Sequence, residues 1–352
     1  MAQQHLDPTD PTAEAVTGNA LAGYLRAQAT EFLRALRLHR ETGGQAAGPE
    51  EPVDAARALR RSARRISASL HTFRPLLDPD WSEEMRPELA WLSGTLGLEH
   101  AYEARLERLL LALHRLSGAA VFPAQAVTAP SNTGGPATAT ATAERANLTV
   151  GAAKAGALLE RQLTLARTRA HSTALQALGS SRFHAVADKV AVLASEVPLT
   201  PTAPATTLHP LTAAAEERLT DAVTALPLVT AGHPYNAEAL VHGLSPDPSP
   251  HPQDSPWHQV RLLLRLHRYA REVLYGGNAP VDVRLLTAGQ ALNRHRDASE
   301  AAAAAAQAAR TPRITPATAY ALGVLHADQR HEVEAARFAF QQAWQKQTVP
   351  AP

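Results

Sequence analysis

Apolar residues recur every three or four positions along most of the chain, which is the spacing of one face of an α-helix. No segment alternates apolar and polar residues over the length of a convincing β-strand. The pattern therefore predicts an all-α protein. Helices are expected over residues 18–41, 53–73, 81–117, 147–178, 182–196, 211–226, 257–275, 281–309 and 317–346.

Segments rich in proline, glycine or threonine interrupt the helical pattern and predict loops or linkers. They cover residues 43–52, 119–146, 198–210 and 245–256. A basic helix followed by a segment with a Leu-Gly or Leu-Asn pair and a histidine occurs in each half of the chain, which suggests an internal duplication. We therefore expect a disordered N-terminus at 1–17, one helical bundle at 18–196, a linker at 197–210, a second bundle at 211–347 and a tail at 348–352.

Composition excludes several classes of protein. The 352 residues include no cysteine, which removes disulfides, zinc-thiolate sites and thiol nucleophiles and fits a reducing compartment. The polar start of the chain does not resemble a signal peptide, and no apolar stretch approaches the roughly 20 residues that span a bilayer. We expect a cytoplasmic, soluble protein without a membrane partner.

Charge is nearly balanced overall but unevenly distributed. The chain carries 34 basic and 33 acidic residues, and because only three of the basic residues are lysine, 31 are arginine. This bias is typical of a GC-rich genome. Arginine nevertheless offers a permanent charge and a planar set of donors that match phosphate oxygens.

The helix expected at 257–275 has an apolar back and a cationic front. His258, Arg261, Arg265 and Arg268 fall on one face, and no acid occurs between Asp254 and Glu272. Like charges stacked at successive turns repel one another unless an anion lies along them. Because the turns are about 5.4 Å apart, a chain of phosphates can meet one cation after another.

The earlier helix at 53–73 repeats this arrangement more loosely. No acid interrupts its basic residues between Ala55 and Asp78. The two stripes together predict a binding site for a linear polyanion. The basic residues of this earlier helix are Arg57, Arg60, Arg61, Arg64 and Arg65.

These residues carry a resemblance to a known family. The stretch at 59–77 reads LRRSARRISASLHTFRPLL and is followed by ELAWL at 88–92 and by Leu96-Gly97. The stretch at 257–272 reads WHQVRLLLRLHRYARE and is followed by LNRHRDA at 292–298 and a final helix at 321–344. Over roughly residues 18–347, the chain resembles the CHAD family, the conserved histidine α-helical domain.

The resemblance implies a fold and a ligand. The fold is all-α, with two antiparallel four-helix bundles related by internal duplication and a basic cleft between them. The ligand is inorganic polyphosphate, and its binding would direct the protein to polyphosphate granules and to other granule proteins. The matching positions are Arg60, Arg64 and Arg65 in the first stripe and His258, Arg261, Arg265, Arg268 and His295 in the second, with a softer match at Arg167, Arg169, His171 and Arg182.

The sequence also departs from the family pattern. Arg57 stands where the first basic helix of the family usually has a histidine, and Ala101 stands where an aspartate is usual. Fewer cations should weaken the binding of a phosphate chain, because binding scales with the number of cations engaged. The usually basic positions that have lost their charge are Ser67, Leu263 and Leu266.

The sequence contains no complete catalytic motif, so we expect a non-enzymatic protein without a catalytic residue, a metal or a cofactor. His295-Arg296-Asp297 reads like a kinase catalytic loop, but the glycine-rich loop and DFG segment that kinases also need are missing. The sequence likewise lacks HExxH, paired acidic metal motifs and a phosphate-binding GxxxxGK loop.

Two other functions stay open. The protein could be a diverged scaffold whose basic surface contacts an acidic protein partner. Nucleic acid is a weaker alternative, because neither a helix-turn-helix signature nor a platform of base-stacking aromatic residues accompanies the arginines.

Overall fold

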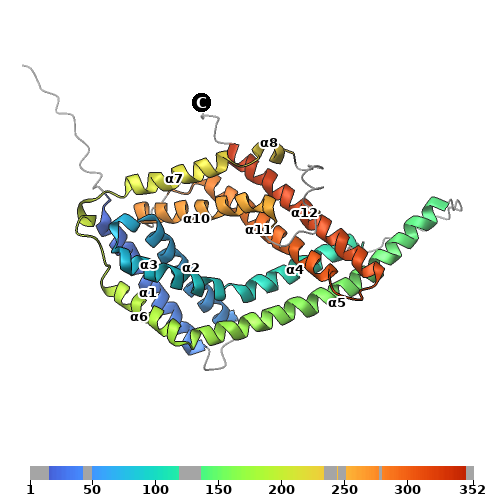
Figure 1. Ribbon diagram of the computed structural model, residues 1–352, viewed down its shortest axis with the longest axis horizontal. Coiled ribbons are helices and arrows are strands. Elements are labelled where there is room, and N and C mark those ends of the chain that lie inside the picture. Colours follow the sequence, from blue (N-terminus) through green and yellow to red (C-terminus); the bar gives the residue numbers. More distant parts are fainter. Residues whose placement is uncertain are drawn as a thin grey trace, which may run out of the picture. The chain divides into compact units, whose positions relative to one another are not determined.

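The computed structural model describes residues 16–42, 50–118, 136–233, 244, 251–276 and 280–345 (Figure 1). Within these ranges the chain is helical, and its only extended pairings are two isolated bridges, between Thr17 and Thr207 and between Leu77 and Leu199. The all-α class is therefore confirmed. Most of the expected disordered N-terminus and all of the expected tail lie outside the described residues.

The main helices follow the expected order. They are α1 (Gly18–Thr42), α2 (Glu50–Thr72), α3 (Pro79–Thr95), α4 (Leu98–Leu116), α5 (Pro136–Leu178), α6 (Ser181–Ser195), α7 (His209–Thr224), α10 (Ser255–Tyr275), α11 (Val283–Ala309) and α12 (Pro316–Gln345). Shorter helical turns are η1 (Arg74–Leu76), η2 (Ala203–Ala205), α8 (Leu228–Ala231) and η3 (Pro252–Asp254). The helices α1, α6, α7, α10, α11 and α12 begin and end within two residues of their expected bounds.

Two expectations about helix bounds were wrong. The single helix expected at 81–117 is divided into α3 and α4, because Gly97 donates its backbone N–H to the carbonyl of Gly94 (3.0 Å) and thereby leaves the α-helical pattern. Two glycines three residues apart also weaken the helix at this point. The linker expected at 119–146 ends earlier than predicted, since α5 begins at Pro136, where a missing N–H costs the first turn nothing. Residues 119–135 lie outside the described residues.

The chain divides into two compact units, and each unit is assembled from separate stretches of sequence. The first unit comprises the residues up to Ser93 together with Ser180–Arg218 and Leu266–Pro280. The second unit comprises Gly94–Gly179, Leu219–Arg265 and the residues from Val281 onward. These units do not coincide with the consecutive bundles expected at 18–196 and 211–347, because the boundaries between units fall inside α3, α7 and α10.

In the first unit, α1 packs against α2 and α6 (Figure 1). The segment expected as a linker at 197–210 is held to this unit by backbone hydrogen bonds. Asp78 donates its N–H to the carbonyl of Pro198 (2.9 Å), and Thr200 donates to the carbonyl of Leu76 (3.0 Å). The core of the first unit includes Leu21, Leu25, Phe32, Leu59, Ile66, Leu70, Phe183 and Val190, all of them fully buried.

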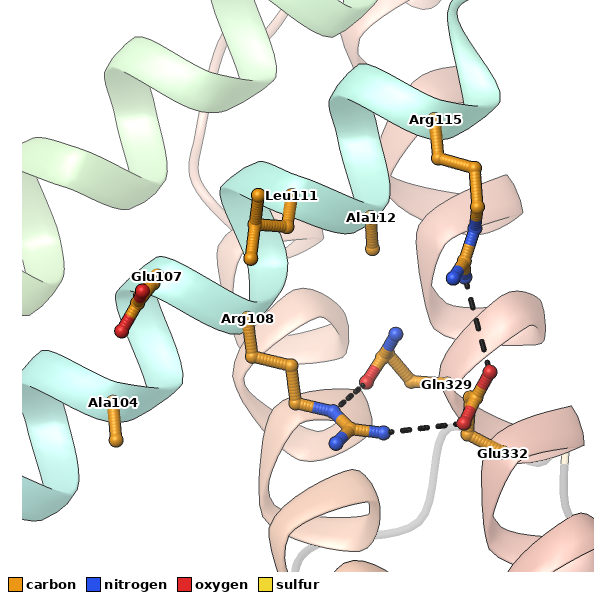
Figure 2. A pocket seen from close by; sticks show the side chains of 8 residues that line it. All are labelled: Ala104, Glu107, Arg108, Leu111, Ala112, Arg115, Gln329 and Glu332. Carbon is orange, nitrogen blue, oxygen red and sulfur yellow. Dashed lines mark hydrogen bonds and ion pairs between the residues drawn. The ribbon is translucent and has the colours of Figure 1, made fainter. Parts of the chain in front are cut away.

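In the second unit, α12 packs along α11 and α5, and α4 packs along α5. One core cluster joins α4, α5, α11 and α12 with small side chains, and a second joins α7, α10, α11 and α12 around Trp257 and Phe340. Polar contacts reinforce the face between α4 and α12 (Figure 2). In Figure 2, Arg108 Nε donates to Gln329 Oε1 (2.6 Å) and Arg115 pairs with Glu332 (3.9 Å). Arg115 also pairs with Asp328 (2.7 Å).

The backbones of α5 and α12 touch at Gly151. A Cβ atom at this position would lie 2.1 Å from the carbonyl oxygen of Ala317 and 3.3 Å from the Cβ of Ala321. Only glycine fits at such a distance. Gly151 therefore sets how closely these two helices approach.

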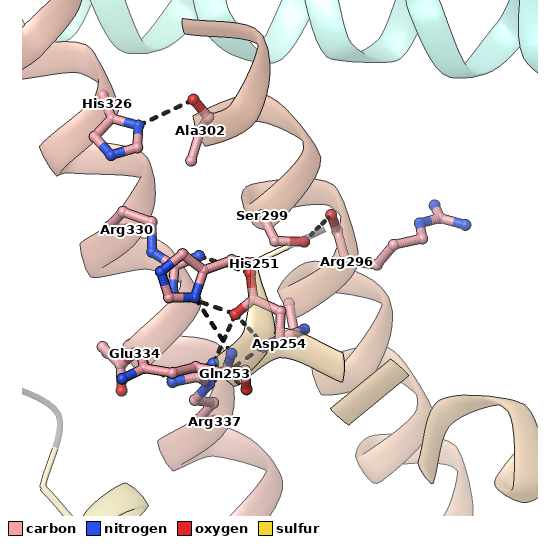
Figure 3. A network of polar contacts seen from close by, with 11 residues as sticks. His251, Gln253, Asp254, Arg296, Ser299, Ala302, His326, Arg330, Glu334 and Arg337 are labelled. Carbon is pink, nitrogen blue, oxygen red and sulfur yellow. Dashed lines mark hydrogen bonds and ion pairs between the residues drawn. The ribbon is translucent and has the colours of Figure 1, made fainter. Parts of the chain in front are cut away.

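A buried ionic network fixes the start of α10 (Figure 3). The carboxylate of Asp254 accepts hydrogen bonds from Arg330 Nη1 (2.7 Å) and from Arg337 Nη2 (2.6 Å) on α12. Arg337 also donates to Glu334 Oε1 (2.7 Å) and to the backbone carbonyl of Gln253 (3.0 Å). Because Asp254 immediately precedes the first residue of α10, these bonds attach the beginning of that helix to α12.

His295 of α11 closes this network. Its Nε2 accepts a hydrogen bond from Arg337 Nε (3.3 Å), its ring stacks on Trp257, and only 1% of the residue is exposed. Burial, with help from Arg337, lowers the pKa of His295 to about 4, and Asp254 only partly offsets this. Burial alone would raise the pKa of Asp254, but its contacts with His295 and Arg330 outweigh burial and hold the pKa well below its usual range.

The contact between α5 and α12 generates the first prediction. Gly151→Ala should destabilise the protein by about 1–3 kcal/mol, because the added methyl group forces two packed backbones apart. Gly323→Ala on α12 is the matched control, since a Cβ there meets nothing within 4 Å. Denaturant unfolding measures both variants. Equal stability of the two variants would contradict the close approach.

A second prediction concerns Asp254. Asp254→Asn should destabilise the protein by about 3–5 kcal/mol, because it leaves two buried arginines without their shared carboxylate. Glu41→Gln is the control. It breaks an exposed ion pair with Arg37 and should change the stability little. Chemical denaturation of both variants tests this difference. A small effect of Asp254→Asn would show that the network does not anchor α10.

The low pKa of His295 predicts how stability depends on pH. In the unfolded chain the imidazole takes up a proton below about pH 6.5, whereas in the folded protein it does so only near pH 4. The free energy of unfolding should therefore fall as the pH decreases from about 6.5 to 4. The groups facing the ring are Asp254, Arg337 and His258.

Thermal unfolding of the wild type and of His295→Gln across this pH range measures the effect. The variant should lose less stability than the wild type between pH 6.5 and 4. Parallel curves for the two proteins would mean that His295 is not the group responsible.

Candidate functional site

The basic residues of α2 surround one side of a helix whose other side is buried. Leu59, Ala63, Ile66 and Leu70 are in the core of the first unit, so the arginines between them are turned outward. Arg57 and Arg61 are exposed, while Arg60, Arg64 and Arg65 are half-buried. Within the part of the chain that the structure describes, Arg61 pairs with no carboxylate.

Two arginines at the flanks of α2 contact neighbouring elements of the first unit. Arg60 Nε donates to the backbone carbonyl of Ser93 on α3 (3.0 Å). Arg65 extends toward the last turns of α10, where it pairs with Glu272 (2.7 Å) and its guanidinium lies 5.5 Å from the ring centre of Tyr269. The structure thus brings the stripe on α2 beside the end of α10 that carries Arg268.

The basic stripe of α10 lies on the side of the helix opposite its buried apolar residues. Trp257, Val260 and Leu264 are buried in the second unit, whereas His258, Arg261 and Arg265 are half-buried and Arg268 is exposed. Arg261 Nε donates to Asn293 Oδ1 on α11 (3.0 Å), an orienting contact that the sequence did not predict. Burial lowers the pKa of His258, and the neighbouring Arg261 contributes in the same direction, although Asp254 opposes it.

His295 differs from the other expected residues because it lies in the protein interior. Its ring contacts that of His258, with ring centres 5.4 Å apart, but at 1% exposure it cannot reach a ligand on the surface. His295 therefore supports the start of α10 from inside. A histidine on the apolar stripe of α11, between Leu292 and Ala298, was the sequence signal for this burial.

Three of the four residues that matched more softly contact carboxylates. In the second unit, Arg167 pairs with Glu103 (3.2 Å) and His171 with Glu99 (3.0 Å), which joins α5 to α4, while Arg169 is exposed. In the first unit, Arg182 pairs with Glu88 (2.6 Å) and lies over the ring of Trp91. Each of these pairs connects two helices of one unit.

The structure also reveals residues that sequence reasoning missed. Asp254, Arg330, Glu334 and Arg337 form the buried network, and Glu272 holds Arg65. The sequence did contain a signal for this network. Arg330 and Arg337 lie three or four positions from the apolar Val333, and Glu334 lies three or four positions from both arginines. These residues therefore share the buried face of α12 with Phe340. The long separation between Arg65 and Glu272 left no local signal for their pair.

A pocket of about 360 Å³ lies in the second unit, between α4 and α12 (Figure 2). Its arginines, Arg108 and Arg115, are directed to acceptors on α12, namely Gln329, Asp328 and Glu332. The pocket contains none of the residues expected to bind a ligand. Among the described residues, no helix is both long enough and apolar enough to cross a membrane.

Comparisons with known proteins agree with this helical fold. The chain is similar to the solved structure of PptA from Streptomyces chartreusis, with 72% identity, coverage of 94% of this chain and 100% of that one, and a TM-score of 0.76. It is also similar in fold to the CHAD domain from the plant Ricinus communis, with 16% identity, coverage of 100% and 98%, and a TM-score of 0.52. No curated protein matches it. The family model described as the CHAD domain matches residues 27–304, and the chain therefore belongs to the CHAD family.

Proposed function

We propose that this protein binds inorganic polyphosphate without catalysing a reaction, and that it does so through the arginine stripes of α2 and α10. The observation that carries the proposal is the arrangement of α10, whose buried back presents His258, Arg261, Arg265 and Arg268 along one outer face. Membership of the CHAD family supports the choice of ligand. The internal duplication and the basic cleft that the family resemblance implies belong to this proposal.

The geometry of the stripe suits a linear phosphate chain. Arginines at successive turns of a helix follow one another at about 5.4 Å, so several phosphates of one chain can each accept charge-assisted hydrogen bonds. Arg268 supports this role, because within the described chain it pairs with no carboxylate and its charge is exposed. Each contact releases counterions, which makes the affinity depend on salt.

The proposed binding has a cellular consequence. A cytoplasmic protein that holds polyphosphate chains would accumulate where those chains accumulate, so we propose that it localises to polyphosphate granules and meets granule proteins there. Any processing of the chains would belong to those partners. Expression as a fluorescent fusion in cells with and without granules examines this part of the proposal.

A scaffold for an acidic protein partner is the second candidate function. Carboxylates already occupy several cations of this protein, as in the pairs of Arg65 with Glu272 and of Arg182 with Glu88. An acidic partner would extend that pattern to the exposed arginines. An acidic partner would compete with polyphosphate for the same arginines. If the surface binds only phosphate chains, it should not retain acidic peptides at physiological salt.

Titration with long-chain polyphosphate tests the proposed function. Changing Arg261, Arg265 and Arg268 together to glutamate should weaken binding by on the order of 100-fold at 0.1 M salt, because three phosphate contacts each contribute a slope of about 0.7 in log affinity against log salt. Arg34, Arg37 and Arg115 changed to glutamate are the control, since they are exposed arginines outside both stripes.

The control variant should bind nearly as tightly as the wild type, and circular dichroism should show that both variants keep their helices. Unchanged affinity of the stripe variant would refute the proposal. Tighter binding to duplex DNA than to polyphosphate at equal salt would favour nucleic acid instead.

A further inference from the structure

Arg65 on α2 is already held by a carboxylate within its own unit. Its Nε donates to Glu272 Oε2 (2.7 Å) and its Nη2 to Glu272 Oε1 (3.4 Å). The two side chains are only 25% and 27% exposed, and the ring of Tyr269 lies against the guanidinium. The pair is thus better shielded from solvent than an ordinary surface ion pair.

Glu272 is held from a second direction. The hydroxyl of Tyr24 on α1 donates to Glu272 Oε2 (3.2 Å), the same oxygen that accepts the bond from Arg65 Nε. Burial and the nearby carboxylate raise the pKa of Tyr24, so the phenol keeps its proton and remains a donor. Two helices of the first unit, α1 and α2, therefore hold the carboxylate that α10 carries.

The position of Glu272 gives the pair its significance. Glu272 lies one helical turn after Arg268 on α10, and it is the first acid of the chain after Asp254. Asp254 is buried and bonded to Arg330 and Arg337, so its charge is matched inside the second unit. Glu272 instead places a negative charge at the end of the cationic stripe.

An anion that approaches Arg65 must compete with this carboxylate. The guanidinium has five N–H donors, and the pair with Glu272 uses two of them. The competing carboxylate is part of the same molecule, so its effective concentration is high and does not fall on dilution. A free anion can replace it only if other contacts hold that anion nearby.

We propose that Glu272 is an internal counter-anion that occupies Arg65 and thereby limits the affinity of this surface for phosphate chains. This inference rests on the proposed function and deepens it. Phosphate chains held by other cations of the stripes can displace the carboxylate, whereas an isolated phosphate lacks those additional contacts. The structure assigns Glu272 a role in selecting ligands with many linked charges.

Glu272→Gln tests the inference, because it removes the charge and preserves the shape of the side chain. Affinity for long-chain polyphosphate should rise about fivefold at 0.1 M salt, and the slope of log affinity against log salt should steepen by about 0.7, the value for one additional phosphate contact. Isothermal titration at two or more salt concentrations gives both quantities. Inorganic phosphate serves as the isolated anion.

Glu83→Gln is the matched control. It also removes one carboxylate from ion pairs of the first unit, those with Arg74 and Arg86, and neither arginine is among the expected binding residues. Both variants change the net charge by the same amount. Affinity should rise for Glu272→Gln alone, and an equal rise in the control would overturn the proposal by showing a general charge effect.

The role of Arg65 is tested by a double-mutant cycle. In an Arg65→Met background, Glu272→Gln should give a clearly smaller gain in affinity, since the released guanidinium is then missing. Tyr24→Phe, which removes one hydrogen bond to Glu272 with little change of shape, should raise affinity slightly and covers the case in which Glu272→Gln does not fold. Unchanged affinity in the folded variants would reject the inference.

The outcomes separate this inference from the proposed function. If the wild type binds polyphosphate and Glu272→Gln binds no better, the proposed function stands and the inference fails. If the wild type does not bind but Glu272→Gln does, the native function is wrong and the internal counter-anion is real.

Discussion

The bonds between Asp254 and the two arginines of α12 are the constraint on which the presentation of α10 depends. A buried carboxylate shared by Arg330 and Arg337 connects the residue before α10 to the middle of α12. Trp257 and His295 then pack around this point, and Phe340 contacts the edge of the Trp257 ring. The stripe of cations thus begins one turn after a buried carboxylate that is bonded to two arginines, so the start of the helix that carries it is held before any ligand arrives.

Apolar spacing predicted most helix bounds because the burial of a helix face is a local property of the sequence. It failed at Leu96-Gly97, where leucines continue the spacing across the break while the backbone changes its hydrogen-bond pattern. The assignment of residues to compact units also could not be predicted, because it depends on which helices pack together. A repeat in the sequence indicates related segments, but it does not say which of them share a core.

The arginine stripes were correctly placed on helices, but the sequence does not show which of their cations are already paired with carboxylates. Ion pairs between distant residues decide this, and the pair of Arg65 with Glu272 joins positions 207 apart in the chain. His295 could have been recognised as buried from its place on the apolar stripe of α11. The contacts of Arg167 and His171 with carboxylates of α4 could not have been predicted without knowing how the helices pack.

The small side chains between α4, α5, α11 and α12 have a consequence for the entropy of folding. This core cluster contains Ala112, Ala152, Ala155, Ala301, Ala305, Ala308 and Ala321 beside its leucines. An alanine has no rotamers to lose when it is buried, whereas a leucine loses on the order of 0.5–1 kcal/mol of side-chain entropy. On folding, the alanines of this core cluster bury little apolar area per residue, but they lose almost no side-chain entropy. The order of the cluster therefore comes from the close contact of rigid helix backbones.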